Sequence, residues 1–316
     1  MEFSRPRGKS VRWLATLISA GIFFPFFSTM NFAQNLAFKP GDPYVPVAIA
    51  ALRQALQNEQ GSIRLHAAEK LIAVGQGAEV RVVFERDLAT TEKTPIVRIG
   101  LWRALAAAAP SPEIRRHYVD QIAAVFLGRD NPDRIHAIES LCKLGVRATG
   151  PLLGAIREMA TGPSEEFAPF AWWALELAGD PEAQAHLAAA LKSPAWVARL
   201  RAAYALRWIG GIKDASILAA LARAADQEPA DSKAAPYVKG SAFALNADPR
   251  RMPAWQRELE SFLDSGTGDV CYEVCHTLVG AMTAADRDRL QARLESAKGD
   301  ARVGLAWAIL SLSSKP

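Results

Sequence analysis

Small and large apolar residues recur with polar ones in a fixed order along most of the chain. In the stretch VARLRAAYALRWIG (Val197–Gly210), Ala202, Ala203 and Leu206 fall on one face of an α-helix, because residues three and four apart share a face. The small side chains let a neighbouring helix approach closely, and Gly210 can adopt the left-handed backbone that ends a helix. The pattern predicts a tightly packed helix followed by a stop.

The same template recurs along the chain with a leucine at its centre, which we call the anchor. Anchors stand at Leu71, Leu105, Leu141, Leu175, Leu206, Leu245, Leu278 and Leu310, separated by 31 to 39 residues. Glycine follows the anchor by four positions at Gly75, Gly145, Gly179 and Gly210. A period of about 34 residues with helical spacing inside each unit predicts stacked helix pairs, which form an α-solenoid.

This pattern resembles the HEAT repeat, in the short bacterial form first noted in phycobilisome lyases. It is best kept in SIRLHAAEKLIAVG (Ser62–Gly75) and in Val197–Gly210, and it covers residues 60 to 312. The resemblance implies an all-α, right-handed solenoid of about eight HEAT-like helix-pair repeats. It also implies that the second helix of each pair lines the concave face, and it implies no activity.

The repeat pattern divides the chain into one elongated domain over residues 47–316, preceded by a proline-rich linker over 34–46. A helix over Val47–Leu56 is expected to cap the first pair, because a solenoid needs terminal units that close the stack. The polar stretch Asp226–Pro236 falls in the longest gap and is expected to be a loop or a flap over the binding groove. Second helices are expected at residues 78–88, 112–127, 151–159, 181–191, 215–225, 253–263 and 285–294.

Residues 1–33 have the pattern of an export signal. Four basic residues lie between Arg5 and Arg12, and the apolar stretch Trp13–Phe27 follows. A basic segment before a short apolar core is typical of a signal peptide or signal anchor, and it predicts that the solenoid lies outside the cytoplasm, in the periplasm or anchored to the inner membrane. Cleavage, retention as an anchor and initiation at Met30 all remain open.

The charge of the chain argues against a nucleic-acid partner. The net charge is +4, and the leader supplies three of these charges through four basic residues and Glu2. The remainder is close to neutral, whereas a nucleic-acid-binding domain shows a basic stripe of its own. We therefore expect membrane contact only through the N-terminal segment.

The sequence contains no common signature of an enzyme or of a metal site. There is no HExxH, phosphate loop, GxSxG or CxxC, and the five histidines are scattered over separate repeats. Cys142, Cys271 and Cys275 are expected to be buried thiols in preference to a disulfide or a metal site, because Cys271, Cys275 and His276 supply too few converging ligands for zinc. We predict no catalytic residue, no cofactor and no metal ion.

The column two residues before the anchor is the strongest candidate for a binding surface. It lies about 160° from the anchor on a helix and is therefore expected to face outward. It contains Glu69, Arg103 and Glu139, followed by Trp173, Tyr204, Phe243 and His276. The last four predict an exposed ridge that binds a partner, unless another segment covers them or the register is wrong. Tryptophans three before the anchor (Trp102, Trp172, Trp307) are expected in the core.

These features predict a non-catalytic scaffold that binds a protein or peptide on the extracytoplasmic side of the membrane. A groove lined by the second helices is the other candidate surface, with Arg81, Arg115, Arg116, Arg157 and Trp255. The alternative function is that of a cytosolic accessory or regulatory protein related to the bilin-lyase type of HEAT protein.

Overall fold

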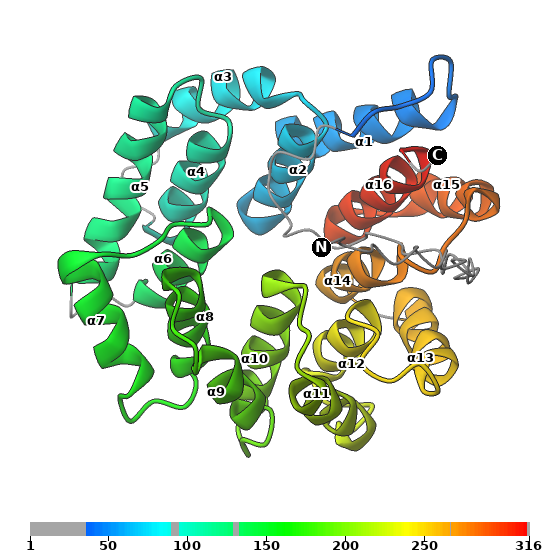
Figure 1. Cartoon of the computed structure of the whole chain (residues 1–316). Helices are drawn as coiled ribbons and strands as arrows, with labels where there is room; N and C mark the ends of the chain where they lie inside the picture. Colours follow the sequence, from blue (N-terminus) through cyan, green and yellow to red (C-terminus); the bar gives the residue numbers. More distant parts are fainter. Residues whose placement is uncertain (1–35, 90–94, 129–132, 266, 315–316) are drawn as a thin grey trace, which may run out of the picture.

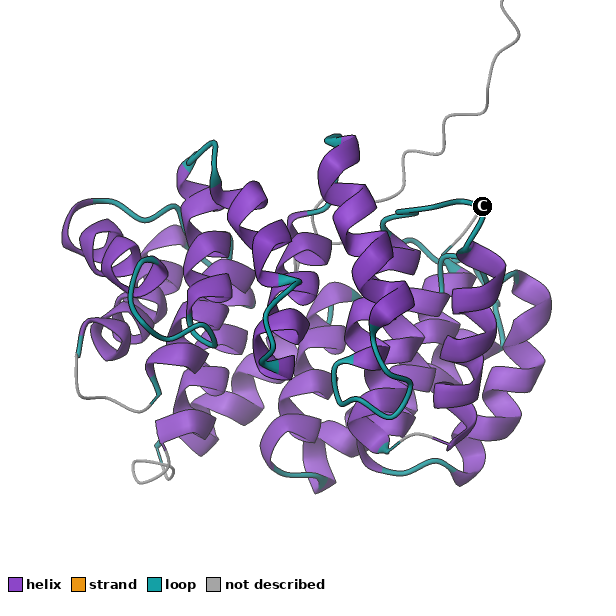
Figure 2. Cartoon of the chain, turned by 90° about the horizontal axis from the view of Figure 1, so that it is seen from below, coloured by secondary structure: helices purple, strands orange, loops and turns teal. Residues whose placement is uncertain are grey.

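The computed structural model describes residues 36–89, 95–128, 133–265 and 267–314, and these residues form an all-α protein. They contain 16 α-helices and one 3₁₀ turn (Ala284–Asp286), and no strand occurs among them (Figure 2). The all-α prediction is therefore confirmed. The predicted leader, residues 1–33, lies outside the described residues. No helix within the described ranges is both long and apolar enough to span a membrane.

The helices alternate between an inner and an outer layer (Figure 1). The inner helices carry the anchors: α2 (Gly61–Ala73), α4 (Pro95–Ala107), α6 (Arg134–Lys143), α8 (Ala168–Ala178), α10 (Trp196–Ile209), α12 (Ala235–Ala244), α14 (Gly268–Leu278) and α16 (Gly299–Ser313). The outer helices are α1 (Tyr44–Asn58), α3 (Gly77–Leu88), α5 (Pro112–Leu127), α7 (Gly150–Ala160), α9 (Ala183–Ala190), α11 (Ala215–Gln227), α13 (Met252–Ser265) and α15 (Arg287–Ser296).

The stack closes on itself to form a ring. Each inner helix packs against the next, and α16 packs against both α1 and α2, so the two ends of the described chain meet (Figure 1). The expectation of an elongated domain is therefore wrong. The assignment of the concave side is also wrong, because the anchor helices, and not the second helices, line the inside. Each outer helix covers the back of the inner layer.

The helix ends follow the predicted glycine signals. Gly75, Gly145 and Gly179 have φ values of 81°, 67° and 94°, which glycine adopts without strain. The residue after each of them donates a backbone hydrogen bond to the carbonyl oxygen of the anchor, Leu71, Leu141 or Leu175. This is the Schellman arrangement that satisfies the free carbonyls at a helix end.

The register differs from the prediction in α12. There the backbone N–H of Ala247 donates to Ala242 and not to Leu245, and Asn246 has the positive φ, 51°, that glycine has elsewhere. Asparagine tolerates this conformation better than other residues with a side chain. The true anchor of α12 is therefore Ala242. The gaps on either side of it are both 36 residues, so Asp226–Pro236 is an ordinary connection and not an insertion.

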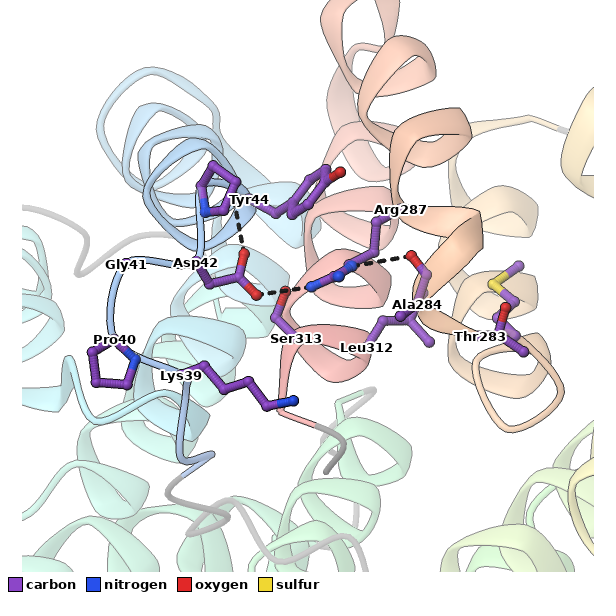
Figure 3. Close-up of a pocket in the computed structure, with 12 residues that line it drawn as sticks. Lys39, Pro40, Gly41, Asp42, Tyr44, Thr283, Ala284, Arg287, Leu312 and Ser313 are labelled. Carbon is purple, nitrogen blue, oxygen red and sulfur yellow. Dashed lines mark hydrogen bonds and ion pairs between the residues drawn. The ribbon is translucent and has the colours of Figure 1, made fainter.

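Asp42 links the two ends of the ring (Figure 3). One of its oxygens accepts a hydrogen bond from the backbone N–H of Tyr44 (2.9 Å), which starts α1, and the other lies 2.8 Å from the guanidinium of Arg287 on α15. The same guanidinium lies 4.6 Å from the centre of the Tyr44 ring. Asp42, in the segment predicted as a linker, therefore joins the first helix to the last pair.

Close backbone approach makes the inner layer compact. A Cβ atom added to Gly304 of α16 would lie 2.7 Å from the Tyr272 Cα atom of α14. One added to Gly240 of α12 would lie 2.9 Å from the Thr277 side chain. Both glycines are thus required by packing, since interiors have no room for even one extra methyl group at such distances.

Candidate functional site

The lumen of the ring is filled by side chains from inner helices that are not neighbours. His66 of α2 stacks on Tyr272 of α14, with ring centres 4.2 Å apart. The Lys143 ammonium of α6 lies 5.6 Å from the Tyr204 and Trp208 rings of α10. Arg207 of α10 also pairs with Glu273 of α14 across the lumen. The lumen is therefore the place where residues far apart in the sequence converge.

The four residues predicted to form an exposed ridge are mostly buried. Trp173, Phe243 and His276 have 2%, 4% and 8% of their surface exposed, and Tyr204 is half-buried. Trp173, Tyr204 and His276 contact other lumen residues, because their column faces the inside of the ring. Phe243 does not face the lumen, because the register shift places it at the C-terminal ends of α12 and α14. The prediction of an exposed ridge is thus wrong, and a role of these residues in partner binding stays a prediction.

One wall of the lumen consists of buried ion pairs. Arg103 of α4 donates from Nε to Glu69 of α2 (2.8 Å) and from a terminal nitrogen to Ser140 of α6 (2.9 Å). Burial by itself would raise the pKa of Glu69, but the positive charges of Arg103 and Lys143 outweigh it and lower that pKa to about 2. Glu69 is therefore ionised, and Arg103 joins three helices through its contacts with Glu69 and Ser140.

The next two ion pairs continue this wall. Lys143 lies 2.8 Å from Glu139, one turn earlier on α6. Burial is the largest single influence on Lys143 and opposes its charge, but the attractions of Glu139, Tyr204 and Glu69 together outweigh it and raise the pKa of the lysine. Arg207 of α10 forms an ion pair with Glu273 of α14. Each carboxylate in this wall thus has a basic partner, as buried charges require.

Lys70 is the exception, because it forms no ion pair within the described part of the chain. Its side chain is 9% exposed, and its ammonium lies 4.6 Å from the Trp307 ring centre and 5.6 Å from that of Tyr272. Burial lowers the pKa of Lys70 to about 8, and the attraction of Glu69 offsets this only in part. This lysine and His276 line a central chamber of about 30 Å³.

His276 presents an unused acceptor to this chamber. Its Nδ1 lies 2.8 Å from the Tyr272 carbonyl oxygen, which can only accept, so Nδ1 carries the hydrogen. Burial and the nearby charge of Lys70 lower the pKa of His276 well below its usual value, so the ring is neutral and Nε2 is an acceptor. Nε2 has no hydrogen-bond partner among the described residues. The chamber volume is enough for one water molecule between polar groups.

The other wall of the lumen is aromatic. Tyr204 of α10 has ring-centre distances of 6.2 Å to Trp173 and 6.2 Å to Phe170, both of α8, and 6.5 Å to Tyr237 of α12. Such tilted and edge-on pairs stabilise a core by about 0.5 to 1.5 kcal/mol each beyond the burial of their area. Burial raises the pKa of Tyr204 and of Tyr237, so both hydroxyls stay neutral.

A mouth cavity of about 240 Å³ opens from the lumen at one end of the ring. It lies at the first turns of the inner helices, which all run in the same direction because an outer helix separates each from the next. The residues that line its rim include Ile135, Phe170, Leu200, Arg201 and Tyr237. The mouth cavity shares His66, Lys143, Tyr204, Tyr272 and Glu273 with the central chamber.

Two exposed aromatic residues lie close in sequence to residues that line the mouth cavity. Phe167 precedes α8, and Trp196 begins α10 one turn before Leu200; each is 40% exposed. Arg201 donates to the Glu166 carbonyl oxygen (2.7 Å), and its guanidinium lies 5.9 Å and 5.5 Å from the Phe167 and Phe170 ring centres. Within the described ranges Arg201 forms no ion pair, so its charge can interact with a bound group.

The second-helix residues proposed as a groove have structural roles or face solvent. Trp255 is buried and donates from Nε1 to Asp226 (3.3 Å). Arg115 donates to the Leu144 carbonyl oxygen (2.6 Å) and so joins two units. Arg116 and Arg157 are exposed on the outside of the ring. These residues do not converge on one site.

The core predictions have a mixed outcome. Cys142, Cys271 and Cys275 are buried free thiols, as predicted. Trp102 and Trp307 are buried, whereas Trp172 is half-buried and stacks on His186, with ring centres 3.7 Å apart. Among the described residues no group of three or more histidine, cysteine, aspartate or glutamate side chains could hold a metal ion together.

Comparison with known proteins adds no name to this geometry. No protein-family model matches the chain, and a search of curated proteins finds no match. The site must therefore be interpreted from its residues. Sequence reasoning missed Lys70, Lys143 and Arg207, although each lies within two positions of an anchor, where a charge at the end of a core helix requires a partner.

Proposed function

We propose that this protein is a ring of HEAT-like repeats that binds a protein partner at the mouth cavity, without catalysis. One observation carries the proposal: Arg201, which has no ion-pair partner among the described residues, lines a cavity of about 240 Å³ and contacts the exposed ring of Phe167. The exposed Trp196 begins α10, one turn before Leu200, which also lines the cavity. Aromatic residues and arginine dominate the binding energy of protein interfaces, especially around a pocket that excludes water.

The size of the cavity favours a side chain of a partner over a complete small molecule. Pockets for drug-sized ligands and cofactors are about 300 to 1,000 Å³, and this one is smaller. An aromatic or aliphatic side chain can enter between Phe170, Leu200 and Tyr237 while neighbouring residues of the partner contact Phe167 and Trp196. A carboxylate next to the inserted side chain can pair with Arg201.

Ring closure supports this location over a continuous groove. An open solenoid offers a long concave surface, but here side chains from non-neighbouring helices fill the lumen. The partner is therefore bound on the rim, with one anchor residue inserted. The inner-helix spacing of 34 to 37 residues in the contacts of Glu69, Arg103 and Ser140 supports HEAT-like repeats. We propose eight helix pairs with a right-handed sense.

We further propose that the ring acts outside the cytoplasm. The support is the basic and then apolar pattern of residues 5–27, which is typical of exported and membrane-anchored proteins. The proposed partner is then a periplasmic or membrane protein. Fractionation of cells that produce the protein, with N-terminal sequencing of the product, tests this point independently of the binding surface.

Site-specific photo-crosslinking tests the binding surface directly. A photoreactive benzophenone amino acid is introduced in place of Trp196, and in a second variant in place of Val82, which is 71% exposed on the outer helix α3. Irradiation of producing cells is expected to yield a defined crosslinked protein from position 196 and none from position 82. Mass spectrometry of the crosslinked band identifies the partner.

A charge reversal supplies the second control. Arg201→Glu in the chain that carries the probe at position 196 should abolish the crosslink, with an unchanged far-UV circular dichroism spectrum and unfolding midpoint. Crosslinks of equal yield from positions 82 and 196, or a crosslink that persists with Arg201→Glu, would contradict a specific site at the mouth.

A further inference from the structure

A second cavity, of about 480 Å³, lies at the seam where the two ends of the ring meet (Figure 3). We call it the seam cavity. One side of it is formed by residues 39–44, which lead into α1, and the other by residues 282–287 and the last turn of α16. The described residues that line it do not line the mouth cavity. Its volume is typical of sites for small molecules, which are about 300 to 1,000 Å³.

The charged side chains that line the seam cavity leave one positive charge in excess. Lys39 and Arg287 line it together with Asp42, which neutralises Arg287 at 2.8 Å. Lys39 is exposed and forms no ion pair within the described part of the chain. Arg287 donates from Nη1 to Asp42 and from Nε to the Ala284 carbonyl oxygen (3.1 Å), so its Nη2 nitrogen is free to donate to a bound group. The cavity thus favours a ligand with a single negative charge.

A buried hydroxyl in the wall of the cavity lacks a hydrogen-bond partner. Ser313 lies in the last turn of α16, lines the cavity and is 3% exposed. Its Oγ atom has no hydrogen-bond partner among the described residues. Buried polar groups are nearly always satisfied in native proteins, because leaving one without a partner costs free energy. An acceptor oxygen of a ligand in the cavity would satisfy this hydroxyl.

The rest of the lining is largely apolar. Met282 and Leu312 are 7% and 2% exposed and belong to the core of the last helix pairs, and Pro40 and Tyr44 contribute rings from the other side of the seam. Burying apolar surface against such a wall is favourable. A ligand that fills the cavity therefore carries an apolar body next to its charged group.

These features together select a carboxylate. A carboxylate has one negative charge and two oxygens that can accept hydrogen bonds from Lys39, Arg287 and Ser313, whereas a phosphate monoester carries a charge close to two. We propose that the seam cavity binds a small organic carboxylate with an apolar body. Because the ligand contacts both ends of the chain, it holds the ring closed. The site is independent of the partner surface at the mouth.

Calorimetric titration of octanoate into the full-length protein tests the site. Wild type is expected to bind one octanoate per chain, and to bind octanamide, which has the same body without the charge, at least 10-fold more weakly. A ligand that binds only the folded ring stabilises it by mass action. Octanoate at about 100 times its Kd should therefore raise the unfolding midpoint by about 5 °C.

Lys39→Gln should weaken octanoate binding by about 10-fold, because it removes the unpaired charge of the cavity. The matched control is Lys192→Gln. Lys192 is an exposed lysine that follows α9, and it does not line the seam cavity. This control should bind octanoate with wild-type affinity.

Ser313→Ala should change affinity and stability in opposite ways. It should weaken octanoate binding several-fold, but raise the unfolding midpoint of the ligand-free protein, because the unpartnered hydroxyl is gone. Ser241 of α12 provides the matched control, since it is also fully buried with an unpartnered Oγ but does not line the cavity. Ser241→Ala should raise the midpoint and leave the affinity unchanged.

Three results would overturn the proposal. Wild type could give no heat of binding, which would mean that the cavity holds only solvent. Octanamide could bind as tightly as octanoate, which would indicate apolar adsorption without recognition of the charge. Octanoate could also bind Lys39→Gln and Ser313→Ala with wild-type affinity, which would place it elsewhere on the protein. Each of these results leaves the crosslinking test of the mouth cavity unaffected.

Discussion

Replacing Lys70 with methionine is expected to stabilise the protein at neutral pH. Methionine fills a similar volume and removes a charge that has no ion-pair partner from the lining of the central chamber. Lys70 is buried, has no carboxylate partner among the described residues and lies against the rings of Trp307 and Tyr272. The outcome depends on whether the free-energy cost of burying the ammonium exceeds the stabilisation from its contacts with these rings.

The two contributions can be compared in magnitude. A fall of the pKa from 10.5 to about 8 corresponds to about 3 kcal/mol of cost for the charged form at pH 7. Contact of a desolvated ammonium with aromatic rings returns about 2 kcal/mol. The cost is larger, so we expect Lys70→Met to raise the free energy of unfolding by about 1 to 3 kcal/mol at pH 7.

The change of stability with pH tests the predicted direction of the effect. The folded state binds the Lys70 proton more weakly than the unfolded state, so the wild type becomes more stable as the pH rises from about 8 to 10.5. The methionine variant lacks this gain. Its advantage should therefore be complete below pH 8 and close to zero at pH 10.5, in urea titrations followed by far-UV circular dichroism.

Lys143→Met is the matched control, because this lysine also lies in the lumen but pairs with Glu139 at 2.8 Å. Removing one member of a buried pair leaves the other charge uncompensated and costs about 3 to 5 kcal/mol. The two substitutions should thus change stability in opposite directions. If Lys70→Met is less stable than wild type at pH 7, the aromatic contacts outweigh desolvation and the reasoning is refuted.

Five further substitutions test other parts of the ring. Glu69→Gln should lower the free energy of unfolding by about 3 kcal/mol at pH 7, because folding lowers the pKa of Glu69 from 4.5 to about 2. In urea titrations, the difference from wild type should vanish as the pH falls from 4.5 to 2. Gly304→Ala should lower the unfolding midpoint, because the added Cβ atom would lie 2.7 Å from a backbone atom of α14. Gly154→Ala is the control: its Cβ atom would meet nothing within 4 Å, so this variant should raise the free energy of unfolding by about 1 kcal/mol. Asp42→Ala should cost about 1 to 2 kcal/mol and speed hydrogen exchange in α1, and Asp42→Asn, which keeps the hydrogen bond at the start of α1 but loses the charge opposite Arg287, should cost less.

Local signals in the sequence were sufficient to predict the helices and their ends. Gly75, Gly145 and Gly179 mark stops because few other residues adopt a positive φ, and the anchor leucines mark the packed faces. The same logic explains the error in α12. Leu245 was predicted as the anchor because it is large and apolar. Asn246, however, has the positive φ that ends the helix, which places the anchor at Ala242.

Ring closure could not be predicted in this way, because it depends on the sum of small rotations between successive helix pairs. A position opposite the anchor is exposed in an open stack but faces the lumen in a closed ring. Trp173 and His276 were therefore assigned to the surface, and α16 was not expected to be buried on nearly all sides. The seam between Asp42 and Arg287 joins residues 245 apart and leaves no local trace.

The charges of the lumen and the closure of the ring depend on each other. The Arg207–Glu273 pair joins α10 to α14 across the gap that α12 spans, and the Glu69–Arg103–Ser140 contacts join α2, α4 and α6. Buried ion pairs add little net stability compared with apolar residues of the same size, but an unpaired buried charge is costly. A ring that closed in another register would leave several charges unpaired. The lumen network therefore disfavours incorrect arrangements more than it stabilises the correct one, which is consistent with its location where non-neighbouring helices must meet.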